Sequence, residues 1–228
     1  MSQTGVVTGL ALRELWISFR LLLLLTAYVA VGAAAALLPA SLPAILVRLA
    51  VGVSAAMIAG AAIAAWSFSL DRILGRAGWL ATRSISRGTI LVGWFVVLAA
   101  VSVPGVALVG LLGWLAASTA ALSLDPVAFG AMFGAIGCGS LALLALGLLL
   151  GAILRPLAAA VSAAVASALI IAAAWFALPR VALPVEALVQ LPRLPAPISI
   201  AVQGGGASLA FAACLVLVAR AALERADL

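Results

Sequence analysis

The ionisable residues of this chain lie mostly in short clusters, and one of these clusters runs from Asp71 to Arg87. All twelve basic residues of the chain are arginines, six residues are acidic, and no histidine is present. Without histidine and lysine the chain has no imidazole base, no imidazole metal ligand and no amine for Schiff-base formation. The chemistry that remains for this group is contact with a partner molecule, and the rest of the chain must position it for that contact.

Other kinds of catalysis are excluded by the same composition. The phosphate-binding loop GxxxxGK[ST] needs a lysine that reaches the phosphates, so a separate polypeptide must hydrolyse ATP if ATP drives this protein. No histidine can pair with a serine, and no paired aspartates lie within the apolar stretches, which excludes intramembrane proteolysis. The apolar stretches also lack the carboxylate that ion-coupled transporters normally use, although a site made of backbone carbonyls stays open.

The two cysteines offer no metal chemistry. Cys138 and Cys214 lie far apart in the sequence and inside apolar stretches, whereas a metal site or a disulfide framework needs clustered cysteines. We interpret them as small packing residues. We therefore expect no catalytic residue, no metal and no cofactor in this chain.

The composition predicts a membrane protein. Hydrophobic residues make up 68% of the chain and its mean hydropathy is +1.39, whereas soluble domains have about 45–50% apolar residues. The net charge of +6 does not indicate nucleic-acid binding, because the arginines flank apolar stretches and form no solvated patch with interleaved aromatic residues. We expect an all-α integral membrane protein whose residues 1–228 form one transmembrane domain.

Six apolar stretches are long enough for a crossing, which needs roughly 20 apolar residues. Prolines mark the turn at Pro39–Pro43 and the turn at Arg155-Pro156, because proline donates no backbone hydrogen bond and disfavours helix in the residue before it. The first stretch is longer than the ~7–15-residue core of a signal peptide, so we expect an uncleaved span. The expected spans are 21–38, 44–66, 89–112, 128–153, 157–178 and 206–223.

The arginines predict the orientation. With the N-terminus inside, nine arginines are cytoplasmic and three (Arg48, Arg180 and Arg193) lie outside, in agreement with the positive-inside rule. An alternative arises from the uncharged run 88–124, which Pro104-Gly105 interrupts; if this run were a hairpin of two spans, eight arginines would lie inside and four outside. We favour one kinked crossing, with both termini on the cytoplasmic side of a bacterial plasma (inner) membrane.

Two segments are not expected to span. Residues 6–19 place apolar side chains at helical spacing beside Trp16, which predicts a helix lying in the cytoplasmic membrane interface, with a simple extension of the first span as the alternative. Residues 179–206 contain five prolines and end in three consecutive glycines, so they are too broken to span. We expect short outer helices there that dip back toward the membrane before the last span.

Two pairs of glycines with a spacing of four residues lie in the fourth expected span. They are Gly130 with Gly134, and Gly147 with Gly151. Such spacing allows close approach of helices. We expect them to serve helix packing, with a mobile gate or a dimer face as the alternative. Apolar spans would line any pathway with hydrophobic surface, which suits a lipid-like or amphipathic substrate better than a sugar or an ion.

The segment between the second and third expected spans has an acidic-basic start, a glycine, a leucine and a Ser-Arg element that leads into the third span. These residues are Asp71-Arg72, Gly75, Leu80, Ser86-Arg87 and Gly93. With them the segment resembles the coupling region of permease subunits of ABC exporters of the ABC-2 type. Ser84 stands where the family often has proline, and Trp94 stands where it often has lysine. The layout is similar as well, with an interfacial helix, six spans, inside termini and a broken outer segment.

The resemblance implies a half-transporter that moves a substrate by alternating access. Its partners would be a second permease, either a copy or a paralogue, and separate ATPase subunits that hold ATP and Mg²⁺. A cytoplasmic helix at about 68–80, within the coupling region 67–88, would dock into a groove of the ATPase. Leu70, Leu74 and Trp79 would be the apolar contacts, and Arg72 and Arg76 would be steering charges. The coupling helix would thus include Leu70, Asp71, Arg72, Leu74, Gly75, Arg76 and Trp79.

Other interpretations stay open. The small size and high hydrophobicity also resemble the CcmB-like haem-exporter permeases of cytochrome c maturation, and the short permeases that export bacteriocins or confer immunity to them. A scaffold or assembly subunit that only anchors partners in the membrane is an alternative from a different class, and segment 67–88 is then a plain basic loop.

Overall fold

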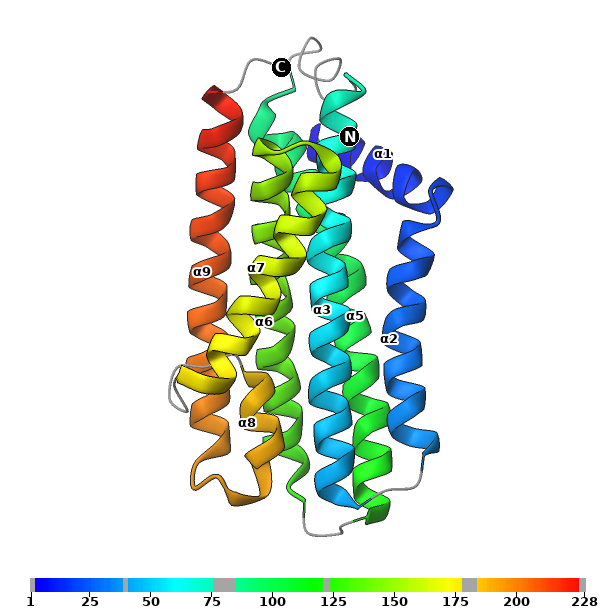
Figure 1. The fold of residues 1–228 in the computed structure, drawn as a ribbon, viewed down its shortest axis with the longest axis vertical. Helices are drawn as coiled ribbons and strands as arrows, with labels where there is room; N and C mark the ends of the chain where they lie inside the picture. The colour runs from blue at the N-terminus through cyan, green and yellow to red at the C-terminus, as the bar shows by residue number, and fades with distance from the viewer. Residues whose placement is uncertain (1–2, 39–40, 76–84, 121–123, 178–183, 226–228) are drawn as a thin grey trace.

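The chain folds into a bundle of long helices (Figure 1). The structure is a computed structural model that describes residues 3–38, 41–75, 85–120, 124–177 and 184–225, and over these residues it contains helices and no strand. The long helices are α2 (Arg20–Leu37), α3 (Leu42–Ile73), α5 (Arg87–Ala120), α6 (Pro126–Ile153), α7 (Pro156–Ala177) and α9 (Pro197–Arg225). All six are long and apolar enough to cross a membrane, so the prediction of an all-α protein with six spans is confirmed.

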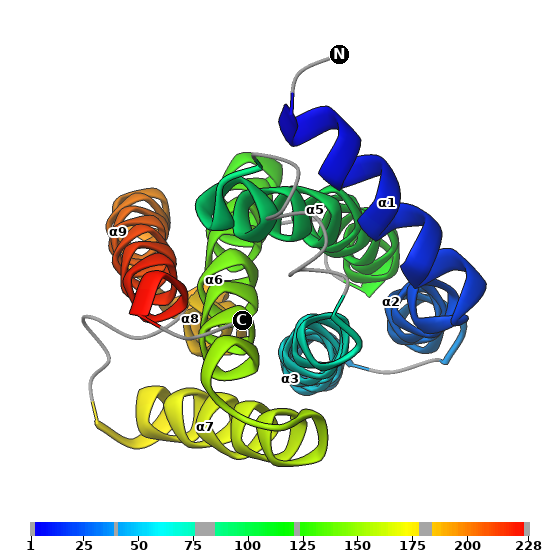
Figure 2. The ribbon, with the colours of Figure 1, turned by 90° about the horizontal axis from the view of Figure 1, so that it is seen from above.

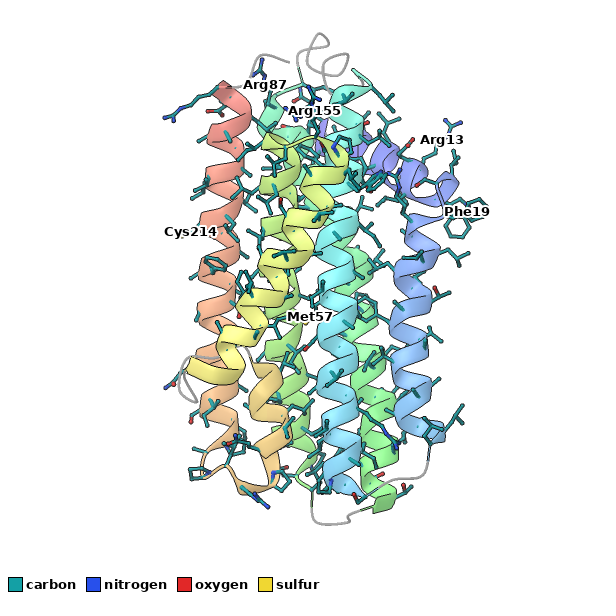
Figure 3. The ribbon with its side chains drawn as sticks, viewed as in Figure 1. Arg13, Phe19, Met57, Arg87, Arg155 and Cys214 are labelled. Atoms are coloured by element: carbon teal, nitrogen blue, oxygen red, sulfur yellow. The ribbon has the colours of Figure 1, made fainter. Side chains whose placement is uncertain are left out.

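Successive long helices run in opposite directions, and the first and last described helices end at the same end of the bundle (Figure 1). Arg13, Arg87 and Arg155 lie at that end (Figure 3), which we call the arginine-rich end. Arg48 lies near the start of α3, at the opposite end, where its guanidinium donates to the Leu38 carbonyl at 3.0 Å. The arginines therefore separate between the two ends of the bundle.

Residues 87–120 form one helix and not a hairpin. Pro104 lies inside α5, where its missing N–H costs one backbone hydrogen bond but does not end the helix. Gly105 follows it and lies against the ring of Tyr28, since a Cβ on Gly105 would come 2.5 Å from that ring. The Pro-Gly pair thus makes room for an aromatic side chain of α2, and the expected single crossing is confirmed.

The N-terminal helix is separate from the first span. Helix α1 (Gln3–Ile17) crosses the arginine-rich end over α5 (Figure 2), and Phe19, in the left-handed conformation with φ of 58°, makes the corner into α2. The side chains that α1 buries are those of Val7, Ala11 and Leu15. Val6, Leu10 and Ile17 of the same helix are exposed.

Two of the long helices extend beyond the expected spans. Helix α3 does not end at residue 66 but continues to Ile73, because its last turns bury serine and aspartate side chains that find partners on neighbouring helices. Helix α9 begins at Pro197 and not at residue 206. Gly204, Gly205 and Gly206 therefore lie within a long helix, where the neighbouring apolar residues and the packing against α6 maintain the helical backbone.

A short helix follows α7, as expected for the segment before the last span. Helix α8 (Pro184–Gln190) and the 3-10 helix η1 (Leu191–Arg193) lie beside α3 and α6 at the end opposite the arginine-rich end (Figure 1). Val185, Leu188 and Leu191 are buried in the main core. The rest of the expected outer segment before Pro184 lies outside the described residues.

The two glycine pairs of α6 differ in their surroundings. Gly147 and Gly151 lie directly against the backbone of α3, at the Ala61 and Ala65 carbonyl oxygens, so close helix packing is confirmed for this pair. A Cβ on Gly130 or Gly134 would meet nothing within 4 Å. Gly130 and Gly134 therefore do not bring two helices of this chain together.

Candidate functional site

The charged segment identified in the sequence is anchored at both of its ends by the arginine-rich end of the bundle. One anchor is the last two turns of α3, and the other is the first turn of α5. Leu74 caps α3, and Gly75 follows with φ of 72°, a left-handed conformation that glycine adopts without strain and that commonly ends helices. Gly75 thus sets where α3 stops.

Asp71 joins α3 to α5. Its side chain is buried, and one carboxylate oxygen accepts a hydrogen bond of 3.3 Å from the indole Nε1 of Trp94. Trp94 is also buried and packs edge-on against Phe68, with ring centroids 6.3 Å apart. Because a buried charge must find hydrogen-bond donors, this contact fixes the end of α3 against α5.

Ser69 and Arg72 join α3 to the junction of α6 and α7. The Ser69 hydroxyl donates to the Leu154 carbonyl at 2.6 Å, and the Arg72 guanidinium donates to the same oxygen at 3.0 Å. Leu154 caps α6 with an extended backbone, so its carbonyl is one of those at a helix C-terminus that find no partner within the helix. Two donors of α3 satisfy this orphan carbonyl.

Helix α2 is attached to the same turns of α3. The Arg20 guanidinium donates to the Ser67 hydroxyl at 3.1 Å, and Ser67 is buried. Arg20 begins α2 directly after the Phe19 corner. The last turns of α3 therefore contact α2, α5 and the α6–α7 junction through polar side chains.

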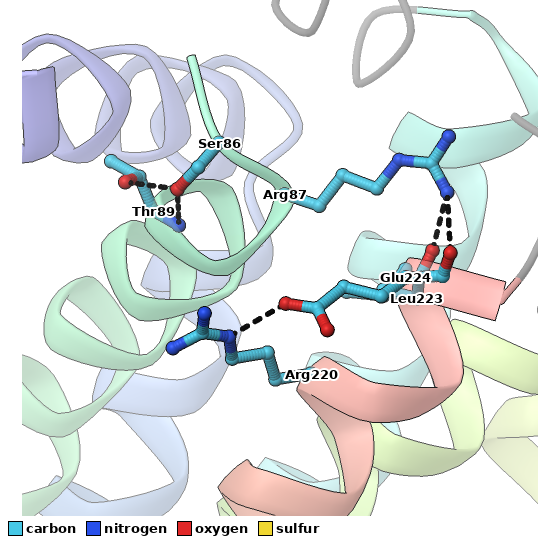
Figure 4. Close-up of polar contacts among 6 residues, drawn as sticks. All are labelled: Ser86, Arg87, Thr89, Arg220, Leu223 and Glu224. Carbon is cyan, nitrogen blue, oxygen red and sulfur yellow. Dashed lines mark hydrogen bonds and ion pairs between the residues drawn. The ribbon is translucent and has the colours of Figure 1, made fainter.

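The start of α5 is attached to the end of α9 (Figure 4). The Ser86 hydroxyl accepts from the Thr89 backbone N–H at 3.1 Å and lies 2.7 Å from the Thr89 hydroxyl, so it satisfies a free donor at the helix start. The Arg87 guanidinium donates to the carbonyl oxygens of Leu223, at 2.6 Å, and Glu224, at 3.5 Å. An arginine at these C-terminal carbonyls also complements the helix dipole.

Arg220 lies on the side of α9 that faces α5. Its Nε donates to a Glu224 carboxylate oxygen at 2.8 Å (Figure 4), and its side chain lies against Gly88, where a Cβ would approach within 3.3 Å. Both side chains of this pair are mostly exposed, so the ion pair itself adds little stability. The Arg220 side chain fills the space beside Gly88, which has no side chain of its own.

Polar contacts connect the two anchors to the rest of the bundle. Asp71 and Arg72 belong to the end of α3, and Arg87 belongs to the start of α5. From those three residues, polar contacts lead to α5, to the α6–α7 junction and to α9. No group of three or more potential metal ligands occurs among the described residues.

The structure describes some of the predicted site residues. The Arg72 guanidinium reaches the Leu154 carbonyl, and its role as a steering charge for a partner stays a prediction. Leu70 is half-buried on α3, whereas Leu74 has 55% of its surface exposed and is available to a partner. Arg76 and Trp79 lie outside the described residues, and the expected helix at 68–80 is not a separate element over its described part, since α3 includes residues 68–73.

Sequence reasoning missed several residues of the site. Ser67, Ser69 and Trp94 make polar contacts between the anchors and other helices. The two serines had no predicted role, and Trp94 was noted only as a departure from a family pattern. The available signal was spacing. Ser67, Ser69, Asp71 and Arg72 follow one another within two helical turns, which is an unusual density of polar residues at the end of an apolar helix.

Comparison with known proteins gives no relative. No family model, no curated protein and no solved structure matches this chain.

Proposed function

We propose that this chain is the membrane-spanning permease subunit of an ATP-driven exporter of the ABC-2 type. In this proposal the chain has no catalytic residue of its own, and separate ATPase subunits bind ATP and Mg²⁺ and hydrolyse the nucleotide. A second permease, either a copy or a paralogue, completes the transporter. The substrate is hydrophobic or amphipathic, in keeping with the apolar character of the spans.

The observation that carries the proposal is the double anchoring of residues 76–84. Asp71, Arg72 and Arg87 flank that segment, and each makes a polar contact with a helix other than its own. A plain loop between two spans needs no such attachment. A segment that receives force from an ATPase does need it, because energy can reach the substrate path only through contacts between helices.

The proposal places the arginine-rich end in the cytoplasm of a bacterium, at the plasma (inner) membrane. Most of the arginines lie at that end, and the described chain begins and ends there (Figure 3).

Fusion of a reporter to the C-terminus tests this orientation. We expect green fluorescent protein fused after Leu228 to fluoresce in cells and alkaline phosphatase fused at the same position to be inactive, because the former folds inside the cell and the latter outside. The reverse pattern would contradict the placement. Fusions after Leu38, at the opposite end of α2, serve as the control and should give the opposite result.

The contact with the ATPase is tested at Leu74 and Trp79. We expect Leu74→Arg with Trp79→Ala to abolish co-purification of a nucleotide-binding subunit that is expressed together with this chain and to remove any stimulation of its ATP hydrolysis, since a charge at an apolar contact costs about 2–5 kcal/mol of binding. Leu37→Arg is the matched control, because Leu37 is an exposed leucine at the opposite end of the bundle.

The outcomes separate the alternatives. Unchanged co-purification and unchanged ATP hydrolysis in the double variant would overturn the proposed coupling contact. If the ATPase binds but no substrate moves in vesicles supplied with ATP, the scaffold interpretation replaces the permease. Transport that follows a proton or sodium gradient without ATP would instead indicate a secondary transporter.

A further inference from the structure

Two hydroxyl groups lie inside the bundle where α2 packs against α5 (Figure 2). Tyr28 belongs to the middle of α2 and Ser102 to the middle of α5. Both side chains are buried, with 1% and 0% of their surface exposed. Because both helices are long and apolar enough to cross a membrane, these hydroxyls lie at a depth where lipid and not water surrounds the bundle.

Gly105 sets the position of the Tyr28 hydroxyl. The ring of Tyr28 lies against Gly105, where a Cβ would come 2.5 Å from it. Residues three apart on a helix share one face, so Ser102 lies beside Gly105, one turn nearer the arginine-rich end. The packing of the ring therefore brings the Tyr28 hydroxyl close to the Ser102 hydroxyl.

Neither hydroxyl is satisfied by the protein. The two lie close together, but their geometry is not that of a direct hydrogen bond, and neither has another partner among the described residues. A serine in an apolar helix commonly donates to a carbonyl one turn earlier in its own helix. Ser54 donates to Ala50 in this way at 2.7 Å, and Ser140 donates to Gly137 at 2.7 Å. Ser102 does not, so its hydroxyl is available to a molecule bound beside it.

The chemistry of the two hydroxyls selects the ligand. A polar group buried without a partner costs free energy, and the cost is greatest where no water is near. Each hydroxyl can donate one hydrogen bond and accept others. One water molecule between them can therefore donate to one hydroxyl and accept from the other, and buried waters typically bridge polar groups in this way.

Other ligands fit these two groups less well. A metal cation takes about six oxygen ligands, and two hydroxyls are too few. Asp71 is the buried acidic residue of the described chain, and it lies at the arginine-rich end, so it supplies no counter-charge beside Tyr28. A site enclosed between two packed helices, with side chains this fully buried, takes a small and neutral polar molecule.

We propose that Tyr28 and Ser102 bind one water molecule between α2 and α5, near the middle of the membrane. The water joins the two helices beside Pro104, where α5 lacks one of its own backbone hydrogen bonds. Its binding is a property of this chain alone and does not depend on the proposed function.

Radiolytic labelling of the full chain in phospholipid nanodiscs tests the proposal. X-ray pulses convert bound water into hydroxyl radicals that modify the nearest side chain, and water made with heavy oxygen marks the product by its mass. We expect Tyr28 to take up heavy oxygen. Met57, which is 2% exposed in the middle of the bundle (Figure 3) and more reactive toward radicals, should stay unlabelled. An unlabelled Tyr28, or equal labelling of Tyr28 and Met57, would overturn the proposal.

Ser102→Ala removes one of the two hydroxyls and leaves the Tyr28 ring against Gly105. We expect this variant to lose most of the label at Tyr28, because the water keeps one partner where it had two. Ser140→Ala is the matched control, since Ser140 is also a buried serine in the middle of a span but already donates to a carbonyl of its own helix. Undiminished labelling of Tyr28 in the Ser102→Ala variant would also overturn the proposal.

Thermal unfolding in detergent gives a second readout. Tyr28→Phe and Ser102→Ala should each lower the unfolding midpoint by about 2–8 °C, because each leaves a buried hydroxyl and its water with fewer hydrogen bonds. The double variant should lose no more than the larger single loss, since groups that share a bound molecule are coupled. If the two shifts add, the hydroxyls share no ligand and the proposal fails. Coupled shifts with no label at Tyr28 would indicate a direct hydrogen bond in place of the water.

Discussion

Gly147→Leu is expected to prevent stable assembly of the bundle. Gly147 lies in contact with the Ala61 carbonyl of α3, so any Cβ at this position collides with backbone and not with a side chain that can rotate away. Gly151 repeats the arrangement one turn later, where a Cβ would lie 2.7 Å from the Ala65 carbonyl oxygen. Relief of the collision requires α3 and α6 to separate, and we expect a loss of at least about 3 kcal/mol.

Gly134→Leu is the control for this prediction, because it makes the same change in the same helix. Gly134 has open surroundings, so the variant should keep its stability or gain about 0.5–1 kcal/mol from the removal of a flexible glycine. Thermal unfolding in detergent, followed by loss of the monodisperse peak in size-exclusion chromatography, measures the difference. Equal midpoints for the two variants would contradict the close packing of α3 and α6.

The contrast between these two glycines shows why the fold could be predicted further than the packing. Spans were predictable because each must be apolar over its whole length, which is a local property of the sequence. Gly134 and Gly147 have the same spacing to a second glycine in the same helix. Which of them faces another helix depends on the rotation of α6 in the bundle, and in a helix that is apolar on every side the sequence does not encode that rotation.

The boundary of α3 could not be predicted for a related reason. Span prediction stops where polar residues begin, and Ser67, Ser69, Asp71 and Arg72 were therefore placed after the span, in the cytoplasmic coupling region 67–88 with its own helix at about 68–80. The helix continues because those side chains find partners on α2, on α5 and at Leu154. Their partners come from distant parts of the sequence, so only the tertiary structure shows that the residues are internal to the bundle.

Trp94 makes two contacts at the arginine-rich end of the bundle. The indole N–H of Trp94 donates to Asp71, and its ring makes the edge-on contact with Phe68. Gly93 beside it leaves room for α1, because a Cβ there would come 2.5 Å from Val7.

Removal of Trp94 is expected to have the second large effect. Trp94→Ala should cost about 3–5 kcal/mol, because it leaves a cavity against Phe68 and removes a donor from the buried Asp71. Trp94→Phe keeps an aromatic ring in the core and loses the indole donor, so we expect a smaller loss of about 1–3 kcal/mol and a folded chain.

Trp94→Phe separates stability from function. Under the proposed function, the folded variant should still bind its ATPase, because no residue of the segment 76–84 is changed, but it should move less substrate per ATP hydrolysed, because the hydrogen bond that ties the end of α3 to α5 is gone. Trp16→Phe is the control, since Trp16 lies at the same end of the bundle and 64% of its surface is exposed. A Trp94→Phe variant that retains full transport per ATP would show that force reaches the bundle through Arg72 and Arg87, without the contact between Asp71 and Trp94.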